Sequence, residues 1–153
     1  MLPYTSIIEI MEKKISVVIP TRNNTNSLLK CLAALTRQTV PYSYFEVIVV
    51  SDGLDQELAN VLNIWQYSHQ MDLRFLQTPS VKGKANAWSF GRQNARGEVV
   101  TFAKDESIPD RNWLNSILHS SHKQKATAYT GKTIVPFASS SITNSLSRIS
   151  KNA

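Results

Sequence analysis

Short runs of β-branched residues alternate along this chain with segments of helical apolar spacing, and this alternation constrains the fold more than any other feature. Residues 15–19 and 45–50 have the composition and length of buried strands, and two further strand-like runs follow at 73–76 and 98–103. The segments between these runs place apolar residues at i, i+3, i+4 and i+7, as one face of a helix requires. Strands that alternate with helices form βαβ units, so the sequence predicts an α/β fold with a mostly parallel sheet flanked by helices.

Capping and turn residues suggest where the helices begin. Ser27 is the expected N-cap of the first helix, Lys82 and Gly83 open the third, and Asp110 is the expected N-cap of the fourth. The apolar faces of the first, second and fourth helices are Leu28, Cys31, Leu32 and Leu35, then Leu58, Val61, Leu62 and Trp65, then Trp113, Leu114, Ile117 and Leu118.

A last strand is expected within residues 126–137, after which the pattern fades into a segment rich in Ser and Asn. We therefore expect a lead-in at residues 1–14, one domain at 15–137 and a Ser-rich basic tail at 138–153. A chain of 153 residues with 42% apolar content is large enough for one domain with its own core.

Cysteine usage and hydropathy indicate the compartment. Cys31 is the single cysteine, which excludes an internal disulfide, and its place in an apolar helical pattern makes it a core residue rather than a nucleophile. No apolar run approaches the roughly 20 residues that a membrane-spanning helix needs. The N-terminus lacks the pattern of a signal peptide. A cytoplasmic location is expected, and a peripheral contact with a membrane stays open.

The net charge of +6 comes from the C-terminal end. Residues 1–110 carry 11 basic and 11 acidic residues, whereas residues 111–153 carry six basic residues and no acidic one. Such a segment attracts anionic lipid or nucleic acid, although a solvated tail has the same composition. The last sixteen residues contain no aromatic side chain on which a base could stack, so we expect no nucleic-acid partner.

Polar residues follow three of the predicted strands. Thr21 and Arg22 follow the first, Ser51 and Asp52 follow the second, and Lys104, Asp105 and Glu106 follow the strand at 98–103. The carboxyl ends of parallel strands share one edge of the sheet, where α/β proteins bind ligands. The sequence therefore predicts a binding site at this edge.

Each group of polar residues also has a simpler interpretation. Asp52, which precedes a glycine, can be a turn residue instead of a ligand contact. Asp105 and Glu106 can form a solvated acidic turn, or they can hold Mg²⁺ or Mn²⁺ together with substrate phosphates. The basic residues around the third helix can bind phosphate or simply cover a solvated helix face; they are Lys82, Lys84 and Arg92.

The blocks of polar and apolar residues together resemble family 2 glycosyltransferases. Residues 17–23 (VVIPTRN) resemble the opening strand and loop of that family, and residues 45–53 (FEVIVVSDG) its second strand with a D-D-G turn. Residues 82–91 and 95–102 look like its third-helix block, and residues 103–110 (AKDESIPD) resemble its acidic D-x-D region. The order of the blocks matches the family from about residue 15 to about residue 137.

The resemblance implies a GT-A fold and a site for a nucleoside diphosphate sugar, of the UDP or GDP type. It implies that Thr21 lies against the base, that Asp52 contacts the base, and that Arg22 and Lys84 lie near the nucleotide. Asp105 would contact the ribose or support a metal.

The resemblance also implies a divalent metal, Mg²⁺ or Mn²⁺, held by Asp105 and Glu106 to stabilise the departing diphosphate. The family reaction is transfer of the sugar to an acceptor hydroxyl with inversion. Three residues depart from the family pattern: Ser51 replaces the first acid of D-D-G, Lys104 replaces the first acid of the D-x-D run, and Glu106 is one methylene longer than the usual aspartate.

The chain ends before the acceptor half of the family, and no residue matches the catalytic base, so the catalytic residues stay unknown at this point. We expect a partner chain or a homo-oligomer to complete the acceptor side. The alternatives are a non-catalytic module that acts by binding a nucleotide or a partner, and a protein that binds anionic surfaces through residues 111–153.

Overall fold

The computed structural model describes residues 13–123. Its sheet has four parallel strands in the order β3-β2-β1-β4. The strands are β1 (Ile15–Thr21), β2 (Phe45–Ser51), β3 (Leu73–Gln77) and β4 (Val99–Phe102). The predicted α/β fold with a parallel sheet is confirmed. The lead-in up to residue 12, the strand expected within 126–137 and the tail at 138–153 lie outside the described residues, so the domain boundaries stay predictions.

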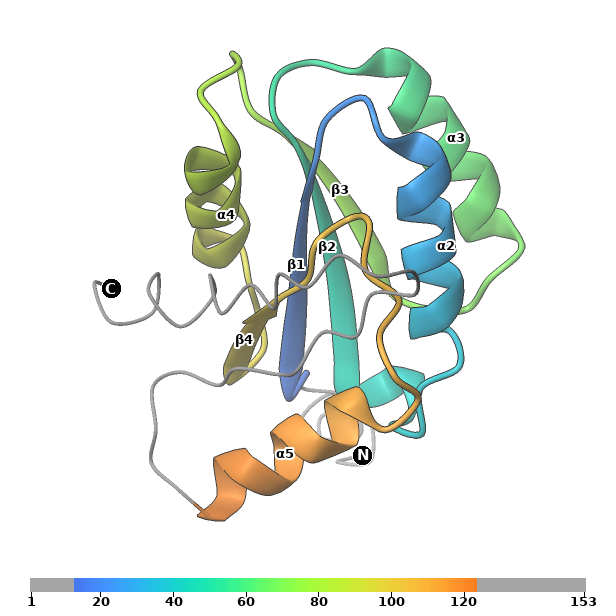
Figure 1. Cartoon of the computed structure of the whole chain (residues 1–153), viewed down its shortest axis with the longest axis vertical. Coiled ribbons are helices and arrows are strands. Elements are labelled where there is room, and N and C mark those ends of the chain that lie inside the picture. The colour runs from blue at the N-terminus through green and yellow to red at the C-terminus, as the bar shows by residue number, and fades with distance from the viewer. Residues whose placement is uncertain (1–12, 124–153) are drawn as a thin grey trace, which may run out of the picture.

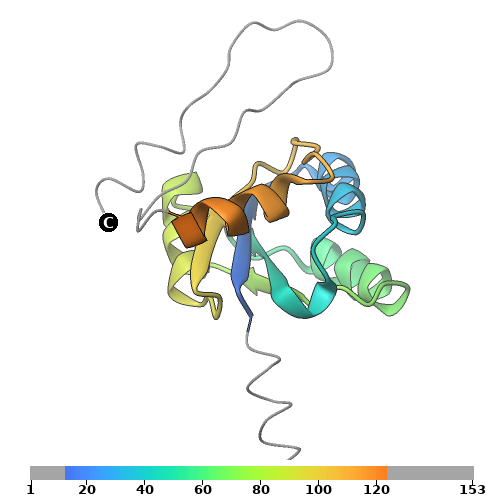
Figure 2. The ribbon, with the colours of Figure 1, turned by 90° about the horizontal axis from the view of Figure 1, so that it is seen from below.

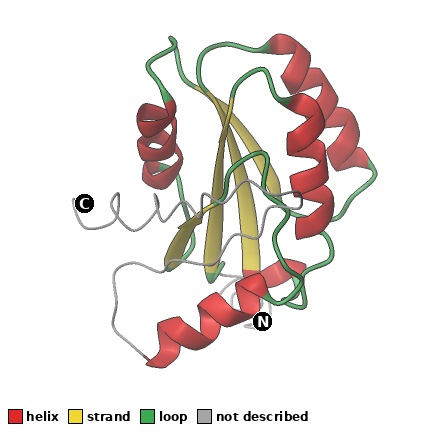
Figure 3. Cartoon of the chain, in the orientation of Figure 1, coloured by secondary structure: helices red, strands yellow, loops and turns green. Residues whose placement is uncertain are grey.

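Helices cover both faces of the sheet. Figure 1 shows α2 (Thr25–Leu35) and α3 (Gln56–Tyr67) on one face and α4 (Lys84–Gln93) on the other. The short 3-10 turn η1 (Tyr42–Tyr44) leads into β2. Helix α5 (Trp113–Lys123) crosses below the amino ends of the strands, as the view from below makes clear (Figure 2). Figure 3 shows the same layers by element type.

Both faces of the central strands are buried, which explains their nearly continuous apolar sequence. The odd-numbered residues of β1 and β2 join the core under α2, α3 and α5: Ile15, Val17, Ile19, Phe45, Val47 and Val49. The even-numbered residues Val18, Ile48 and Val50 pack against Ala87 and Trp88 of α4. Each strand therefore contributes alternate side chains to two separate cores.

Helix α4 lies especially close to the sheet, and Gly91 is the residue that allows it. A Cβ at this position would lie 2.4 Å from Val18 Cγ1 and 3.0 Å from Val50 Cγ2. Any larger side chain would push the helix away from β1 and β2.

A buried polar network ties the segment after α4 to the sheet. Glu46 is 0% exposed, and its Oε1 accepts hydrogen bonds from Ser16 Oγ at 2.7 Å and from the N–H of Arg96 at 2.8 Å. Its Oε2 lies 3.1 Å from Arg74 Nη1, which also donates to the carbonyl of Asn94. Burial by itself would raise the pKa of Glu46, but the bonds from Ser16, Arg96 and Arg74 outweigh it and hold that pKa below its usual range.

Two predicted helix caps are wrong. Helix α2 begins at Thr25 after Asn24, so Ser27 lies inside its first turn. Helix α5 begins at Trp113, three residues after Asp110, whose Oδ1 instead accepts from the N–H of Asn112. The N–H of Leu114 in the first turn of α5 is bonded by Gln38 Oε1 at 3.0 Å, from the loop between α2 and β2. A cap supplied from so far away in the chain leaves no local signature.

None of the helices within residues 13–123 is both long and apolar enough to span a bilayer.

Candidate functional site

Loops at the carboxyl ends of the strands enclose a pocket of about 390 Å³. They are the loops after β1, β2 and β4 and the segment that enters α4, which come together in the upper part of Figure 1. The pocket is lined by Pro20, Thr21, Arg22, Asn23, Asn24, Asp52, Gly83, Lys84, Asp105 and Glu106. The six residues that the family resemblance assigned to nucleotide or metal binding are all in this set, whereas Lys82 and Arg92, the other basic candidates near the third helix, are not.

The loop after β1 provides one wall. Thr21 ends the strand and is 2% exposed, whereas Arg22 and Asn23 are exposed. Asn23 has a φ of 53°, a left-handed conformation that Asn tolerates better than most residues. Asn24 is the N-cap of α2, but its side chain makes no capping bond. Sequence reasoning missed Asn23 and Asn24, although their position next to Arg22 was a usable signal.

Asp52 organises the opposite wall. Its side chain is nearly buried, and its two carboxylate oxygens accept the N–H groups of Lys82 at 2.8 Å and Gly83 at 3.0 Å. Gly83 has a φ of 97°, which a glycine adopts without steric cost, and it is the N-cap of α4. Asp52 therefore holds the segment that brings Lys84 and the N-terminus of α4 to the pocket.

The acidic pair closes the third side. Asp105 is 5% exposed, and its Oδ2 accepts the hydroxyl of Thr21 at 2.8 Å. Glu106 is exposed beside it. Ser107 completes a tight turn by donating its N–H and its hydroxyl to the carbonyl of Lys104.

The hydroxyl of Thr21 is already bonded within the protein, and its contact with a base stays a prediction. Its hydroxyl hydrogen is donated to Asp105, and only 2% of the residue is exposed.

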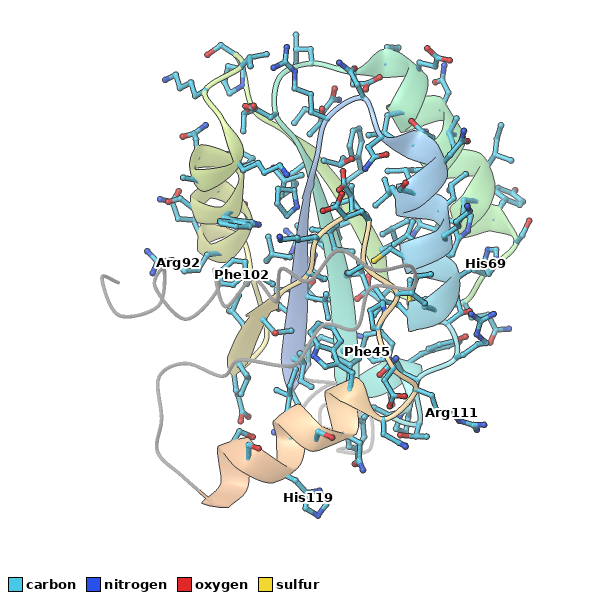
Figure 4. The ribbon with its side chains drawn as sticks, in the orientation of Figure 1. Phe45, His69, Arg92, Phe102, Arg111 and His119 are labelled. Carbon is cyan, nitrogen blue, oxygen red and sulfur yellow. The ribbon has the colours of Figure 1, made fainter. Side chains whose placement is uncertain are left out.

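Two other basic residues stand apart from the lining. Arg92 lies in the last turn of α4, at the end of the helix far from Lys84 (Figure 4). Of the two interpretations given to these basic residues, the solvated helix face fits Arg92, which is exposed. Lys104, in the loop after β4, does not line the pocket.

Cys31, His69 and His119 form no catalytic arrangement with one another in the part of the chain that the structure describes. Cys31 is fully buried in α2, 3.9 Å from Ser107 Oγ, and its pKa is raised to about 11, mainly by burial. It is thus a neutral core thiol, as predicted. His69 stacks on Trp65 with ring centroids 3.9 Å apart, and His119 is exposed. Within residues 13–123 no cluster of three or more His, Cys, Asp or Glu could hold a metal.

A family model described as glycosyl transferase family 2 matches residues 16–151 of this chain. Glycosyltransferase AglE of Haloferax volcanii is 32% identical over 101 residues, which cover 65% of this chain and 33% of that protein. Glycosyltransferase GlyG of Streptococcus pneumoniae is 26% identical over 121 residues, which cover 79% of this chain and 39% of that protein. The chain thus spans about a third of the length of these relatives.

Solved structures agree with this assignment. The crystal structure of residues 1–349 of S. aureus TarS superposes with a TM-score of 0.65 at 26% identity, over 74% of this chain and 34% of that TarS chain. The mannosyltransferase PcManGT from Pyrobaculum calidifontis, in complex with GDP-Man and Mn²⁺, has the same fold, with a TM-score of 0.64 at 23% identity over 69% of this chain and 31% of PcManGT. The chain therefore belongs to glycosyl transferase family 2 and has a GT-A fold.

Proposed function

We propose that the pocket binds the nucleoside diphosphate of a UDP- or GDP-sugar, and that the whole protein transfers the sugar to an acceptor hydroxyl. One observation carries this proposal: a single pocket combines the N-terminus of α4, two basic side chains and an acidic pair. A diphosphate needs positive charge and N–H donors, and a metal that bridges it needs carboxylates.

Helix N-termini and basic side chains form the side of the pocket that is assigned to the phosphates. Neither α2 nor α4 has a side-chain cap or an acidic residue in its first turn. By contrast, Asp55 caps α3, and Glu57 lies in the first turn of that helix. Free N–H groups at the N-termini of α2 and α4 therefore add to the positive potential that Arg22 and Lys84 create.

The donor set suits Mg²⁺ or Mn²⁺ that arrives with its ligand. Asp105 and Glu106 supply two adjacent carboxylates, and these metals usually bind through one or two carboxylates plus phosphate oxygens. When bound, the metal would neutralise charge on the diphosphate leaving group. Because two carboxylates alone make a weak site, we expect the metal and the nucleotide to bind cooperatively.

The base side of the pocket is assigned to Asp52. Each carboxylate oxygen has a second lone pair, so Asp52 can hold Lys82 and Gly83 and still accept a hydrogen bond from a base. Solved complexes of related proteins support a nucleotide here, since TarS has been solved with UDP and with UDP-GlcNAc. Asp105, beside Thr21, would contact the ribose.

Calorimetric titration of the protein with UDP and GDP, with and without Mn²⁺, tests the proposal. We expect one nucleotide to bind, and its affinity to rise when Mn²⁺ is present. Glu106→Gln should remove most of the gain from Mn²⁺, whereas Glu57→Gln, an exposed acid on α3, should leave it unchanged.

Failure of the folded protein to bind either nucleotide would overturn the proposal. Saturable binding with no sugar transfer to any acceptor would leave the nucleotide site standing and would favour a non-catalytic module.

A further inference from the structure

Thr21 lies between Asp52 and Asp105, two of the three acids that line the pocket, and bonds to both. Its hydroxyl donates to Asp105 Oδ2 at 2.8 Å, and its carbonyl accepts the N–H of Asp52 at 3.2 Å. This position follows from the strand order, because β1 lies between β2, which precedes Asp52, and β4, which precedes Asp105.

We propose that Thr21 is a positioning residue: its hydroxyl fixes the carboxylate of Asp105 in the orientation that the ligand requires, without contacting the ligand itself. This inference deepens the proposed function and rests on it for its consequence, but the contact that it invokes can be tested without any ligand.

Burial makes the bond a strong constraint. Thr21 is 2% exposed and Asp105 is 5% exposed, so little water competes for either group. A hydroxyl bonded to a carboxylate is charge-assisted and shorter than a neutral pair. Among the described residues, this is the one side-chain hydrogen bond that holds Asp105.

The type of residue suits the task. A β-branched side chain has few χ1 rotamers, so the Thr21 hydroxyl is aimed by its own backbone as well as by packing. The backbone of Thr21 is fixed in turn by the parallel pairing of β1 with β2, in which Thr21 is opposite Ser51. A rigid strand end therefore holds a carboxylate that otherwise belongs to a loop.

Two substitutions separate the hydroxyl from the shape of the side chain. Thr21→Val keeps the shape and removes the donor, whereas Thr21→Ser keeps the donor. Thr101→Val is the matched control, because Thr101 is also a buried threonine, lies in neighbouring β4 and does not line the pocket.

The experiment combines these variants with Asp105→Asn in two double-mutant cycles. The first cycle measures the free energy of unfolding in urea, with no ligand present. A coupling between Thr21→Val and Asp105→Asn is expected, since the two groups share one bond. No measurable coupling would overturn the inference, whatever the nucleotide titrations show.

The second cycle measures the affinity for UDP and GDP in the presence of Mn²⁺. Thr21→Val should weaken binding about tenfold, as the loss of a partner that orients a ligating group commonly does. Thr21→Ser should restore most of the affinity, and Thr101→Val should leave it unchanged. In the Asp105→Asn background, Thr21→Val should have no further effect.

The outcomes distinguish the alternatives. If Thr21 contacted the ligand directly, Thr21→Val would still lower the affinity for the nucleotide in the Asp105→Asn background. That result would overturn a purely positioning role. An affinity for Thr21→Val equal to that of Thr101→Val would do the same. If the protein with no substitution binds neither nucleotide, the proposed function fails, while the coupling in the unfolding cycle still decides whether Thr21 holds Asp105.

Discussion

Two buried carboxylates hold helix α4 from opposite ends. At its N-terminal end Asp52 accepts the N–H groups of Lys82 and Gly83, and beyond its C-terminal end Glu46 accepts the N–H of Arg96. Because α4 carries Lys84 into the pocket, the geometry of the site depends on both acids. One acid lines the pocket and the other lies at the far end of β2.

Asp52 should matter more than its neighbour Ser51. Removing the carboxylate in Asp52→Ala releases two N–H groups, each hydrogen bond to a charged group being worth about 1.5–3 kcal/mol, and frees the segment before α4. We expect the affinity for UDP or GDP to fall about tenfold or more in calorimetric titration. Ser51→Ala should have little effect, because Ser51 does not line the pocket and bonds Thr78 through its carbonyl.

Equal losses of nucleotide affinity in Asp52→Ala and Ser51→Ala would contradict the assignment of Asp52 to the base side of the pocket. Thermal unfolding of both variants serves as the check that each remains folded during the titration.

Glu46 should make the stability of the fold depend on pH. Its pKa is lowered in the folded state, so its contribution is complete above the unfolded pKa of about 4.3 and is lost as the pH falls through the lower folded pKa. At pH 7 we expect Glu46→Gln to reduce the free energy of unfolding by about 3 kcal/mol, since it leaves Arg74 without its buried partner. That gap should narrow as the pH falls below about 4.

Urea unfolding at several pH values measures this gap. Glu98→Gln is the control, because the pair of Glu98 with Lys14 is exposed and should contribute little at any pH. If the difference in free energy of unfolding between the unsubstituted protein and Glu46→Gln stayed constant with pH, the lowered pKa of Glu46 would be disproved.

At the scale of elements, the start of α5 is held by a loop in addition to the burial of its own residues Leu114 and Ile117. Gln38 is 9% exposed and bonds both the N–H of Leu114 and the carbonyl of Asp110. The adjacent Thr39 donates its N–H to the carbonyl of Arg111. The loop between α2 and β2 thus anchors the far end of the segment that carries the acidic pair.

Gln38→Leu should therefore destabilise the protein more than Asp110→Ala. The first change leaves a buried N–H of α5 unsatisfied, which costs about 1–3 kcal/mol, whereas the Asp110 carboxylate makes an exposed bond. Urea unfolding gives the two free energies, and hydrogen exchange should show faster exchange at the start of α5 in Gln38→Leu. If Asp110→Ala lowered the free energy of unfolding more than Gln38→Leu does, the prediction that Asp110 caps α5 would stand again.

At the scale of the whole molecule, the two sides of the sheet are unequal. The core under α2, α3 and α5 contains many more buried residues than the core under α4. Within residues 13–123, no strand pairs with the outer edge of β4, where Val99, Val100 and Phe102 are only half-buried. An edge of this kind is a template for pairing with another chain.

We therefore expect the chain to self-associate or to depend on a partner that covers this edge. Sedimentation velocity over a range of concentrations should show a mass that rises with concentration. Tyr67→Lys, a change on the exposed outer side of α3, should leave that association unchanged. A monodisperse monomer at all concentrations would rule out self-association.

The sequence by itself determined the class of fold and the edge of the sheet at which the candidate site lies. Apolar periodicity predicted the described strands and helices because local spacing directly reflects burial, and the rule for parallel sheets placed Thr21, Asp52 and Asp105 at one edge. The family motifs added the expected type of ligand.

Only the tertiary structure decided which groups hold one another. The bond from Thr21 to Asp105 joins residues 84 apart, and the bond from Leu114 to Gln38 joins residues 76 apart. Such pairs leave no periodic trace, since each depends on how strands and loops stack in space. For the same reason, Asp52 could be assigned to a turn or to a ligand from sequence, whereas the folded chain shows it holding the segment that begins α4.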